Sequence, residues 1–384
     1  MTIFNIKQCL IAVAVFTLYL SEAQSTVLLP NPSGPYKVGL NTIKLVDETR
    51  LDPFAPDCRP RAVMLSLFYP VNLRSEYNLT CLSEYMPAVT ATFEDQKYSP
   101  FGLLIGSFEK LSLQVSCKNS SVYHHNDYPV VLFSPALETS RLLYNAIAQS
   151  VASSGYIVAS IDHPYDADIV EFPDGSFVLG ANISSDAQVA LAVDTRAQDA
   201  SFVLNELRKE SVAKHLLRGA RRGFNVSKVA MFGHSLGGAA AAAAMLNDSR
   251  IVGGLDLDGS VYGPVVDQGL DRPFLLWGHQ AKNRSMDETW ATLWRHLRGW
   301  KLELELDGST HYTFSDFPLV AKVLDLVNGL PPEDKALLGT LDGLRVIEIV
   351  GAYVTAFLDF VLRGVNTTLL QKPDPKYPEV TFVP

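Results

Sequence analysis

The 384-residue sequence has no excess of basic side chains, and this absence excludes a large class of partners. It contains 32 Lys and Arg against 41 Asp and Glu, a net charge of -9. Nucleic-acid binding needs concentrated positive charge, because phosphate contacts supply most of the affinity. We therefore expect no nucleic acid among the partners of this protein.

Cysteine is also scarce, and its spacing matches no common metal-binding pattern. The four cysteines form no C-x-x-C pair and no cluster with histidine. We expect neither a metal ion nor a cofactor. Cys9 falls in the N-terminal leader, which leaves Cys58, Cys81 and Cys117, an odd number. We expect one disulfide and one free thiol, and the sequence leaves all three pairings open.

The N-terminus has the pattern of a secretory signal peptide. MTIFNIKQ carries one lysine, CLIAVAVFTLYL is apolar, and SEA ends in small residues. The apolar run is short for a membrane span, although an N-terminal anchor is the alternative. We predict a signal peptide over 1–23, cleaved after Ala23, and a secreted, extracellular protein.

Asn-x-Ser/Thr triplets agree with export, because such asparagines accept glycans in secreted proteins. Some triplets arise by chance, so we expect several but not all of them to be modified. The candidates are Asn78, Asn119, Asn182, Asn225, Asn247, Asn283 and Asn366.

The mature chain, 24–384, contains no repeat, low-complexity block or linker, and we expect a single domain. Hydrophobic residues make up 47% and charged residues 19% of the sequence, which is typical of a globular protein with a large core. Short apolar runs alternate with segments of helical spacing, a pattern that predicts a doubly wound, mostly parallel α/β sheet with flanking helices. The expected strands are 61–71, 128–135, 155–164, 228–235, 251–258, 272–279 and 300–308; the expected helices include 140–154 and 186–207.

Two segments need separate explanations. Residues 72–127 fit the alternation poorly, so we expect an insertion over one sheet edge or over the functional site. The run 346–362 resembles a membrane span, but Glu348 and Asp359 interrupt it. We predict an amphipathic final helix that packs on the sheet.

The segment Gly233-His234-Ser235-Leu236-Gly237 matches the G-x-S-x-G nucleophile elbow, between an apolar strand and an alanine-rich helix. In such an elbow the serine adopts a strained backbone conformation that projects its hydroxyl above the sheet. A Cβ at either glycine would collide with the neighbouring strand and helix. The alternative is a glycine-rich turn with a surface serine.

A nucleophilic serine needs a histidine base and an orienting carboxylate, which follow it in the order acid, then histidine. His279 ends a strand and could contribute to the rim, and His296 lies in a helical stretch. His311 lies in the loop after the last expected strand, where it can reach the serine, so we expect His311 to be the base.

The orienting acid is expected at the end of the strand LDLD. Asp258 lies at the carboxyl end of that strand, where ligands and catalytic groups of parallel sheets gather. Asp256 lies two residues earlier on the same face of the strand and is the alternative candidate for the acid. If it is not the acid, we expect it to support Asp258. We expect Asp258 to be the acid. The oxyanion hole would combine the N–H of Leu236 with that of Leu137, in the loop 132–140.

These segments together resemble the secreted platelet-activating factor acetylhydrolase family, including its fungal relatives in the α/β-hydrolase superfamily. The similar stretches are 133–167, 232–239, 253–259 and 309–317. The resemblance implies Ca²⁺-independent hydrolysis of a short acyl ester at the sn-2 position of a glycerophospholipid. It also implies Ser235, Asp258 and His311 as triad and Leu236 and Leu137 as oxyanion donors. Pro135-Ala136 departs from the His-Gly that family members often have before the oxyanion residue.

Three functions follow as hypotheses. The first is a secreted phospholipid acetylhydrolase that takes a small ester or phospholipid substrate. The second is a general secreted carboxylesterase on small or polymeric esters, because the triad serves any acyl transfer. The third is an inactive hydrolase-like binding protein, against which the intact Ser, Asp and His argue. The sequence leaves open a transient contact with a membrane or lipid surface.

Overall fold

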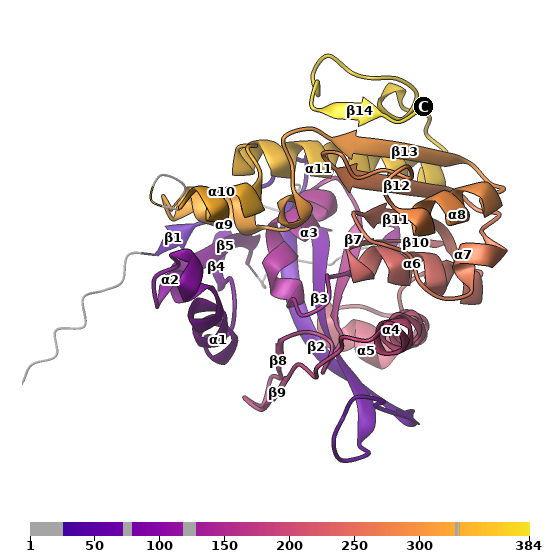
Figure 1. Cartoon of the computed structure of the whole chain (residues 1–384). Helices are drawn as coiled ribbons and strands as arrows, with labels where there is room; N and C mark the ends of the chain where they lie inside the picture. The colour runs from indigo at the N-terminus through magenta and orange to yellow at the C-terminus, as the bar shows by residue number, and fades with distance from the viewer. Residues whose placement is uncertain (1–25, 72–78, 118–127, 327–328, 330) are drawn as a thin grey trace, which may run out of the picture.

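The computed structural model describes residues 26–71, 79–117, 128–326, 329 and 331–384 (Figure 1). The expected signal peptide lies outside these residues, as do Asn78 and Asn119. No helix in the described residues is long and apolar enough to cross a membrane.

A nine-stranded sheet forms the centre of the molecule (Figure 1). Six strands in the middle of the sheet, in the spatial order β7, β6, β10, β11, β12 and β13, run parallel. The outer strands are antiparallel: β3 pairs with β7, β2 with β3, and β14 with β13. In spatial order the strands are β14 (Val380–Phe382), β13 (Lys301–Leu306), β12 (Phe274–His279), β11 (Ile251–Leu257), β10 (Val229–His234), β6 (Val130–Ser134), β7 (Ile157–Asp162), β3 (Pro60–Val71) and β2 (Lys37–Leu51).

Helices cover both faces of this sheet, as the alternation of strands and helices predicts. Alternate residues of the buried strands face opposite layers: Met231 packs in one hydrophobic cluster and Phe232 in the other. The Phe232 side holds α3 (Asn145–Ser153), α9 (Phe317–Val323) and α11 (Gly343–Leu358). The Met231 side holds α4 (Asp186–Leu207), α5 (Glu210–Leu216), α6 (Leu236–Asn247), α7 (Val265–Gln268) and α8 (Glu288–His296).

The expected helix over 186–207 is confirmed residue for residue in α4. It begins there because the Ser185 hydroxyl accepts a hydrogen bond from the Gln188 N–H and the Gln188 Oε1 accepts one from the Ser185 N–H, a capping box. The predicted final helix is also confirmed: α11 continues into a π-helical turn, Asp359–Arg363, and packs against α3 and α9.

The described part of the 72–127 insertion forms a small layer beside the main sheet. It consists of β4 (Thr80–Glu84), α1 (Ala88–Tyr98), α2 (Ser107–Lys110) and β5 (Leu111–Ser116), with β1 (Val27–Leu28) completing a three-stranded sheet. The structure also has two short strands, β8 (Ile169–Glu171) and β9 (Phe177–Leu179), and the helix α10 (Pro332–Leu338).

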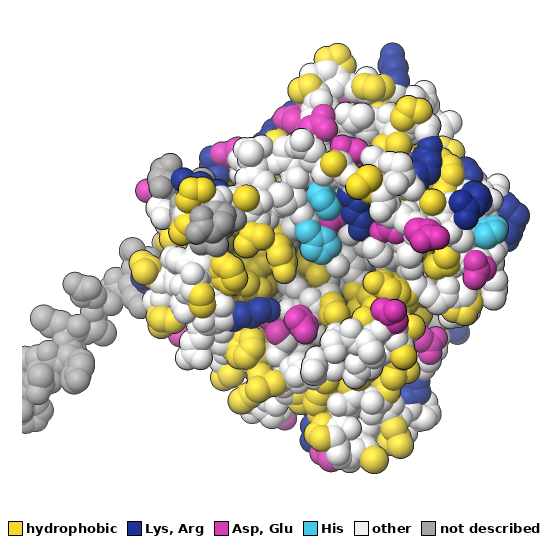
Figure 2. Space-filling view, in the orientation of Figure 1, with side chains coloured by type: hydrophobic (Ala, Val, Ile, Leu, Met, Phe, Trp, Pro, Cys, Tyr) yellow, Lys and Arg dark blue, Asp and Glu magenta, His cyan; other side chains and the backbone are white. Residues whose placement is uncertain are grey.

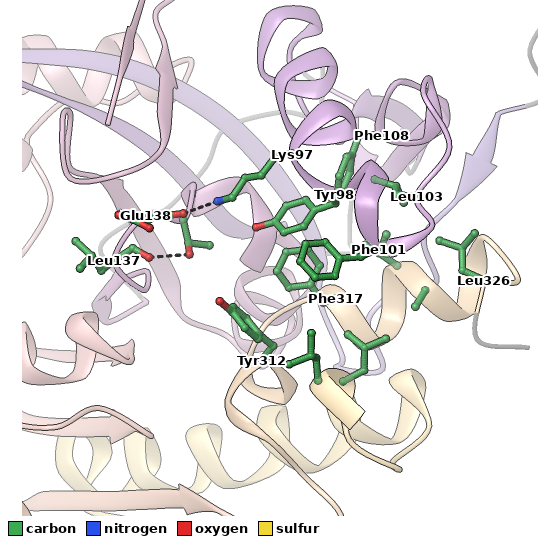
Figure 3. A pocket seen from close by; sticks show the side chains of 15 residues that line it. Lys97, Tyr98, Phe101, Leu103, Phe108, Leu137, Glu138, Tyr312, Phe317 and Leu326 are labelled. Atoms are coloured by element: carbon green, nitrogen blue, oxygen red, sulfur yellow. Dashed lines mark hydrogen bonds between the residues drawn. The ribbon is translucent and has the colours of Figure 1, made fainter. Parts of the chain in front are cut away.

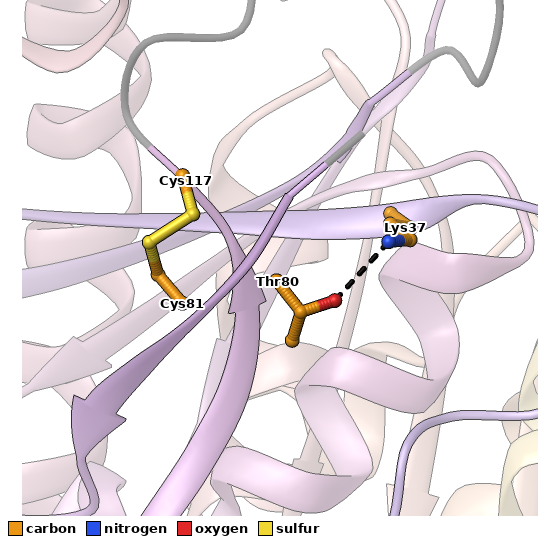
Figure 4. The surroundings of a disulfide bond; sticks show 4 residues. All are labelled: Lys37, Thr80, Cys81 and Cys117. Atoms are coloured by element: carbon orange, nitrogen blue, oxygen red, sulfur yellow. Dashed lines mark hydrogen bonds between the residues drawn. A yellow bond between two sulfur atoms is a disulfide. The ribbon is translucent and has the colours of Figure 1, made fainter. Parts of the chain in front are cut away.

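Of the three pairings that the sequence leaves open, the structure has Cys81–Cys117 (Figure 4). Cys58 is a free, exposed thiol. Beside the disulfide, Lys37 of β2 donates a hydrogen bond of 3.1 Å to Thr80 of β4. The disulfide thus cross-links the antiparallel pair of β4 and β5, and the contact between Lys37 and Thr80 joins that pair to the main sheet.

Candidate active site

Ser235 occupies a sharp turn between β10 and α6. Its backbone has φ 55° and ψ -123°, a conformation that non-glycine residues rarely adopt. A Cβ on Gly233 would lie 2.3 Å from the Gly237 carbonyl, and one on Gly237 would lie 2.0 Å from the Ser134 carbonyl oxygen. Both positions therefore require glycine, as the sequence pattern predicts.

His311 and Asp258 come from separate loops and meet directly. His311 begins the short 3₁₀ turn His311–Phe314 after β13, and Asp258 follows β11 in a left-handed conformation, φ 66°. The His311 Nδ1 lies 2.5 Å from the Asp258 Oδ2. Asp258 is fully buried, whereas the His311 side chain is 39% exposed, so the ring can meet a substrate while its partner is shielded from water.

Asp258 also holds a second histidine, a contact that the sequence reading missed when it placed His279 at the rim. His279 ends β12, the strand beside β11, and both its backbone N–H and its Nδ1 contact the Asp258 Oδ1, at 2.8 and 2.7 Å. Burial would raise the pKa of Asp258, but hydrogen bonds from the two histidines and the charge of Lys282 hold it below its usual value. Asp258 is therefore an anion at neutral pH.

Asp256 has the opposite environment. It is buried, its Oδ1 accepts the Gly259 N–H at 2.8 Å, and its Oδ2 has no hydrogen-bond partner among the described residues. Burial raises the pKa of Asp256 well above its usual value. A neutral carboxyl that fixes the turn after Asp258 suits a supporting role.

His234, the elbow residue before Ser235, packs its ring against that of His311. Its Nδ1 is 2.8 Å from the Tyr144 hydroxyl, and its ring centroid lies 4.6 Å from that of His311. Burial, together with the charge of His311, holds the pKa of His234 well below its usual value. Because His234 directly precedes Ser235, its contact with His311 places His311 beside the Ser235 turn. Among the described contacts the Ser235 side chain makes no hydrogen bond, and such bonds often tighten only when substrate is present.

In the loop after β6, the N–H of Leu137 lies between two N–H groups that have acceptors. The N–H of Ala136 donates to the Tyr144 hydroxyl at 3.2 Å, and that of Glu138 donates to the Asp166 carbonyl at 3.0 Å. No described group accepts the N–H of Leu137, the residue between them. Leu137 packs in the same apolar cluster as Leu236, whose N–H begins α6. The two expected oxyanion donors thus belong to adjacent segments.

An apolar cavity of about 270 Å³ adjoins these loops (Figure 3). Leu137 and Tyr312, the neighbour of His311, line one side of it, and the insertion supplies Tyr98, Phe101 and Phe108 on the other. On the molecular surface, histidine side chains lie beside a hollow lined with hydrophobic atoms (Figure 2). The insertion therefore lines the cavity next to the site, which is nearer to the expected placement over the functional site than to the one over a sheet edge.

The remaining candidates are accounted for individually. His296 lies on α8 and donates from Nδ1 to the Val266 carbonyl, away from Asp258. His234, Asp258 and His311 bring one ligand atom each within 4.8 Å of one another. The hydrogen bonds to Tyr144 and between Asp258 and His311 already explain that arrangement, so we assign no metal to it.

Comparison with known proteins gives the family. The model of platelet-activating factor acetylhydrolase, isoform II, matches residues 21–172 and 180–358. The chain belongs to the platelet-activating factor acetylhydrolase family. A probable 1-alkyl-2-acetylglycerophosphocholine esterase of Arthroderma benhamiae is 34% identical over 98% of this chain and 99% of its own. The platelet-activating factor acetylhydrolase of Cavia porcellus is 23% identical over 86% and 77%.

A solved structure agrees with this assignment. The ferulic acid esterase of Streptomyces cinnamoneus superposes with a TM-score of 0.76 at 29% identity, covering 94% of this chain and all of that one. The chain therefore has the α/β-hydrolase fold expected from its sequence. Like its acetylhydrolase relatives, it is a carboxylic ester hydrolase, and its substrates are small esters or phospholipids.

Proposed function

We propose that this acetylhydrolase family member is a secreted serine esterase that removes short sn-2 acyl groups, acetyl above all, from glycerophospholipids without Ca²⁺. The observation that carries the proposal is the hydrogen bond between Asp258 and His311 beside the strained Ser235 turn. An inactive binding protein would have no need of this arrangement.

In the proposed mechanism, Ser235 attacks the ester carbonyl while His311 takes its proton. Asp258 accepts from the His311 Nδ1, which leaves Nε2 to act as the base, and its negative charge stabilises the imidazolium. The developing oxyanion accepts hydrogen bonds from the N–H groups of Leu236 and Leu137. The alcohol departs with the proton from His311, and water then hydrolyses the acyl-enzyme on Ser235 by the reverse sequence.

A second candidate function, a general carboxylesterase, has its own support. The cavity beside the site is lined by aromatic rings, and the similar solved structure is a ferulic acid esterase. Such a pocket accepts apolar and aromatic groups as readily as a lipid chain, because apolar burial is not directional.

One side-by-side assay decides between the two. Purified protein is given a 1-alkyl-2-acetyl-glycerophosphocholine and a simple aryl ester, each in excess chelator, with Ser235→Ala as the control. We expect both substrates to be cleaved and Ser235→Ala to cleave neither. Cleavage of the aryl ester alone would favour the general esterase. A requirement for Ca²⁺, or full activity in Ser235→Ala, would contradict the proposed mechanism.

A further inference from the structure

Residues 134–139, which we call the oxyanion loop, are held by hydrogen bonds from buried side chains. A loop normally satisfies its backbone through turns and water. Here the carbonyls of Pro135 and Ala136 and the hydroxyl of Ser134 all accept hydrogen bonds from one buried guanidinium, that of Arg196 on α4. The loop is therefore held from the protein interior by a buried side chain that is not exposed to substrate.

Arg196 is itself held rigidly. Its Nε donates to the Asp166 Oδ2 at 2.7 Å, and its Nη2 pairs with the other oxygen of the same carboxylate. The remaining N–H groups reach the Pro135 carbonyl at 2.5 Å, the Ser134 hydroxyl at 3.0 Å and the Ala136 carbonyl at 3.2 Å. Lysine, with one ammonium, cannot reproduce this planar fork.

A buried chain of hydrogen bonds orients the first residue of the loop. His163 contacts Asp199 through Nδ1 at 2.8 Å and Ser134 through Nε2 at 3.0 Å, and all three residues are buried. Burial lowers the pKa of His163, so its ring is neutral. The carboxylate fixes the proton on Nδ1, so Nε2 accepts from the Ser134 hydroxyl. The Ser134 oxygen then remains free to accept from Arg196.

Tyr144 joins the oxyanion loop to the elbow. Its hydroxyl accepts the Ala136 N–H at 3.2 Å and contacts the His234 Nδ1 at 2.8 Å. Since Ala136 precedes Leu137, and His234 lies one residue before Ser235, this single oxygen links the two segments that carry the proposed oxyanion donors. It is buried and packs against Phe133, so it has no route to the substrate.

We propose that Arg196 and Tyr144 are positioning residues that set the distance between the N–H groups of Leu137 and Leu236, and that they thereby control transition-state stabilisation rather than substrate binding. This inference rests on the proposed function, in which those two N–H groups form the oxyanion hole.

The test compares Tyr144→Phe and Arg196→Lys with wild type on one chromogenic aryl ester. Removing a whole oxyanion donor costs about 10²–10³ in kcat. Displacing one should cost less, so we expect kcat to fall about 10- to 100-fold with KM changed less than about threefold. Affinity for an alkyl boronic acid, which forms a tetrahedral adduct with the serine, should fall in parallel with kcat.

Matched controls separate positioning from general destabilisation. Tyr156→Phe removes a buried hydroxyl that donates to Asp359, and Arg272→Lys disturbs a guanidinium that binds the carbonyls of Asp248 and Ile251. Tyr156 and Arg272 precede β7 and β12, at the opposite end of the parallel strands from Ser235. Both controls should lose thermal stability while keeping kcat within about twofold.

Three results would overturn the proposal: an unchanged kcat in Tyr144→Phe, a rise in KM alone, or equal losses in the control variants. Tyr144→Phe keeps the ring packing and is expected to fold, so it decides the matter even if Arg196→Lys does not fold. Failure of the proposed function is distinguishable: a wrong nucleophile would leave Ser235→Ala active, and a wrong substrate class would leave the acetylated phospholipid uncleaved by wild type.

Discussion

At the scale of single residues, two carboxyl groups at the end of one strand differ in charge: one is an anion and the other is neutral. Asp256 and Asp258 are both buried, yet only Asp258 receives hydrogen bonds from histidine and lies below its usual pKa. Asp258 is the anion that can stabilise an imidazolium, whereas Asp256 is a neutral support of the following turn.

Replacing each carboxyl group with an amide should separate these roles. Asp258→Asn should lower kcat by up to about 10⁴, the effect of the same change in a serine protease, because the amide favours the wrong tautomer of His311. Asp256→Asn should lower kcat less than about fivefold, because an amide resembles a neutral carboxyl and keeps the acceptor for Gly259. The measurement is kcat on one chromogenic ester, with circular dichroism as the check on folding. A severe Asp256→Asn beside a mild Asp258→Asn would reverse the assignment.

Residue types and order were sufficient to predict most of the candidate site. Gly233, Gly237 and the strand before Ser235 indicate the elbow, and chain order leaves few histidines to choose from. The second histidine on Asp258 could not be predicted, because it depends on β12 lying beside β11 in the sheet. Tyr144 and Arg196 carry no motif, and their contacts exist only in three dimensions.

At the scale of elements, the sequence predicts well those helices and strands that have local signals, and less well those that depend on pairing between distant segments. The α4 boundaries follow from a capping box and the buried strands from continuous apolar runs. In contrast, β2 is a 15-residue strand that the sequence reading missed. It pairs with β3 along one edge of the sheet and ends in the polar residues Asp47–Arg50, which carry no apolar alternation. Part of the aromatic pocket lining, Tyr98, Phe101 and Phe108, likewise comes from an insertion without regular spacing.

One carboxyl group joins three elements and should make stability depend on pH. Asp316, before α9, accepts hydrogen bonds from the Ala146 N–H of α3 at 2.8 Å and from the Tyr85 hydroxyl at 2.9 Å. Burial raises the pKa of Asp316 to about 7, and these hydrogen bonds only partly offset that effect. An unfolded aspartate has a pKa of about 3.9.

Folding therefore takes up a proton at Asp316 between these two pH values. The stability due to the protonated group should be fully present below about pH 4 and lost as the pH rises through 7. Asp316→Asn, which resembles the protonated form, should lose less stability between pH 5 and pH 8 than wild type. The readout is Tm by differential scanning fluorimetry across that range. Parallel Tm curves for the two proteins would show that Asp316 does not titrate there.

At the scale of the whole molecule, the functional end of the sheet is assembled from distant parts of the chain. Ser235, Asp258 and His311 follow β10, β11 and β13, and the insertion brings Tyr98, more than a hundred residues earlier in the chain, to the cavity that Tyr312 also lines. The carboxyl ends of parallel strands lie at one edge of the sheet, so residues that directly follow these strands come close together. For this reason the order of strands and loops in the sequence predicts the three residues. The contribution of the insertion to the pocket depends on tertiary packing, which explains why the pocket could not be predicted.

Export of the molecule can be tested through its glycosylation pattern. Asn182, Asn225, Asn247 and Asn366 are exposed, whereas Asn283 is half-buried. The Asn283 amide nitrogen, the atom to which a glycan would be attached, donates to Glu305 at 3.2 Å, so a glycan there would have to disturb this contact.

For protein secreted by a eukaryotic host, we expect an N-terminus near Gln24 and glycans on several of the four exposed sites, with Asn283 the least occupied of the five described sites. Glycopeptide mass spectrometry, before and after enzymatic deglycosylation, measures both features. As a matched pair, Asn225→Gln should reduce the mass by one glycan, whereas Asn283→Gln should leave it unchanged. An intact Met1, or no mass loss on deglycosylation, would contradict export by a cleaved signal peptide. High occupancy at Asn283 would show that this loop is glycosylated before its contacts with Glu305 form.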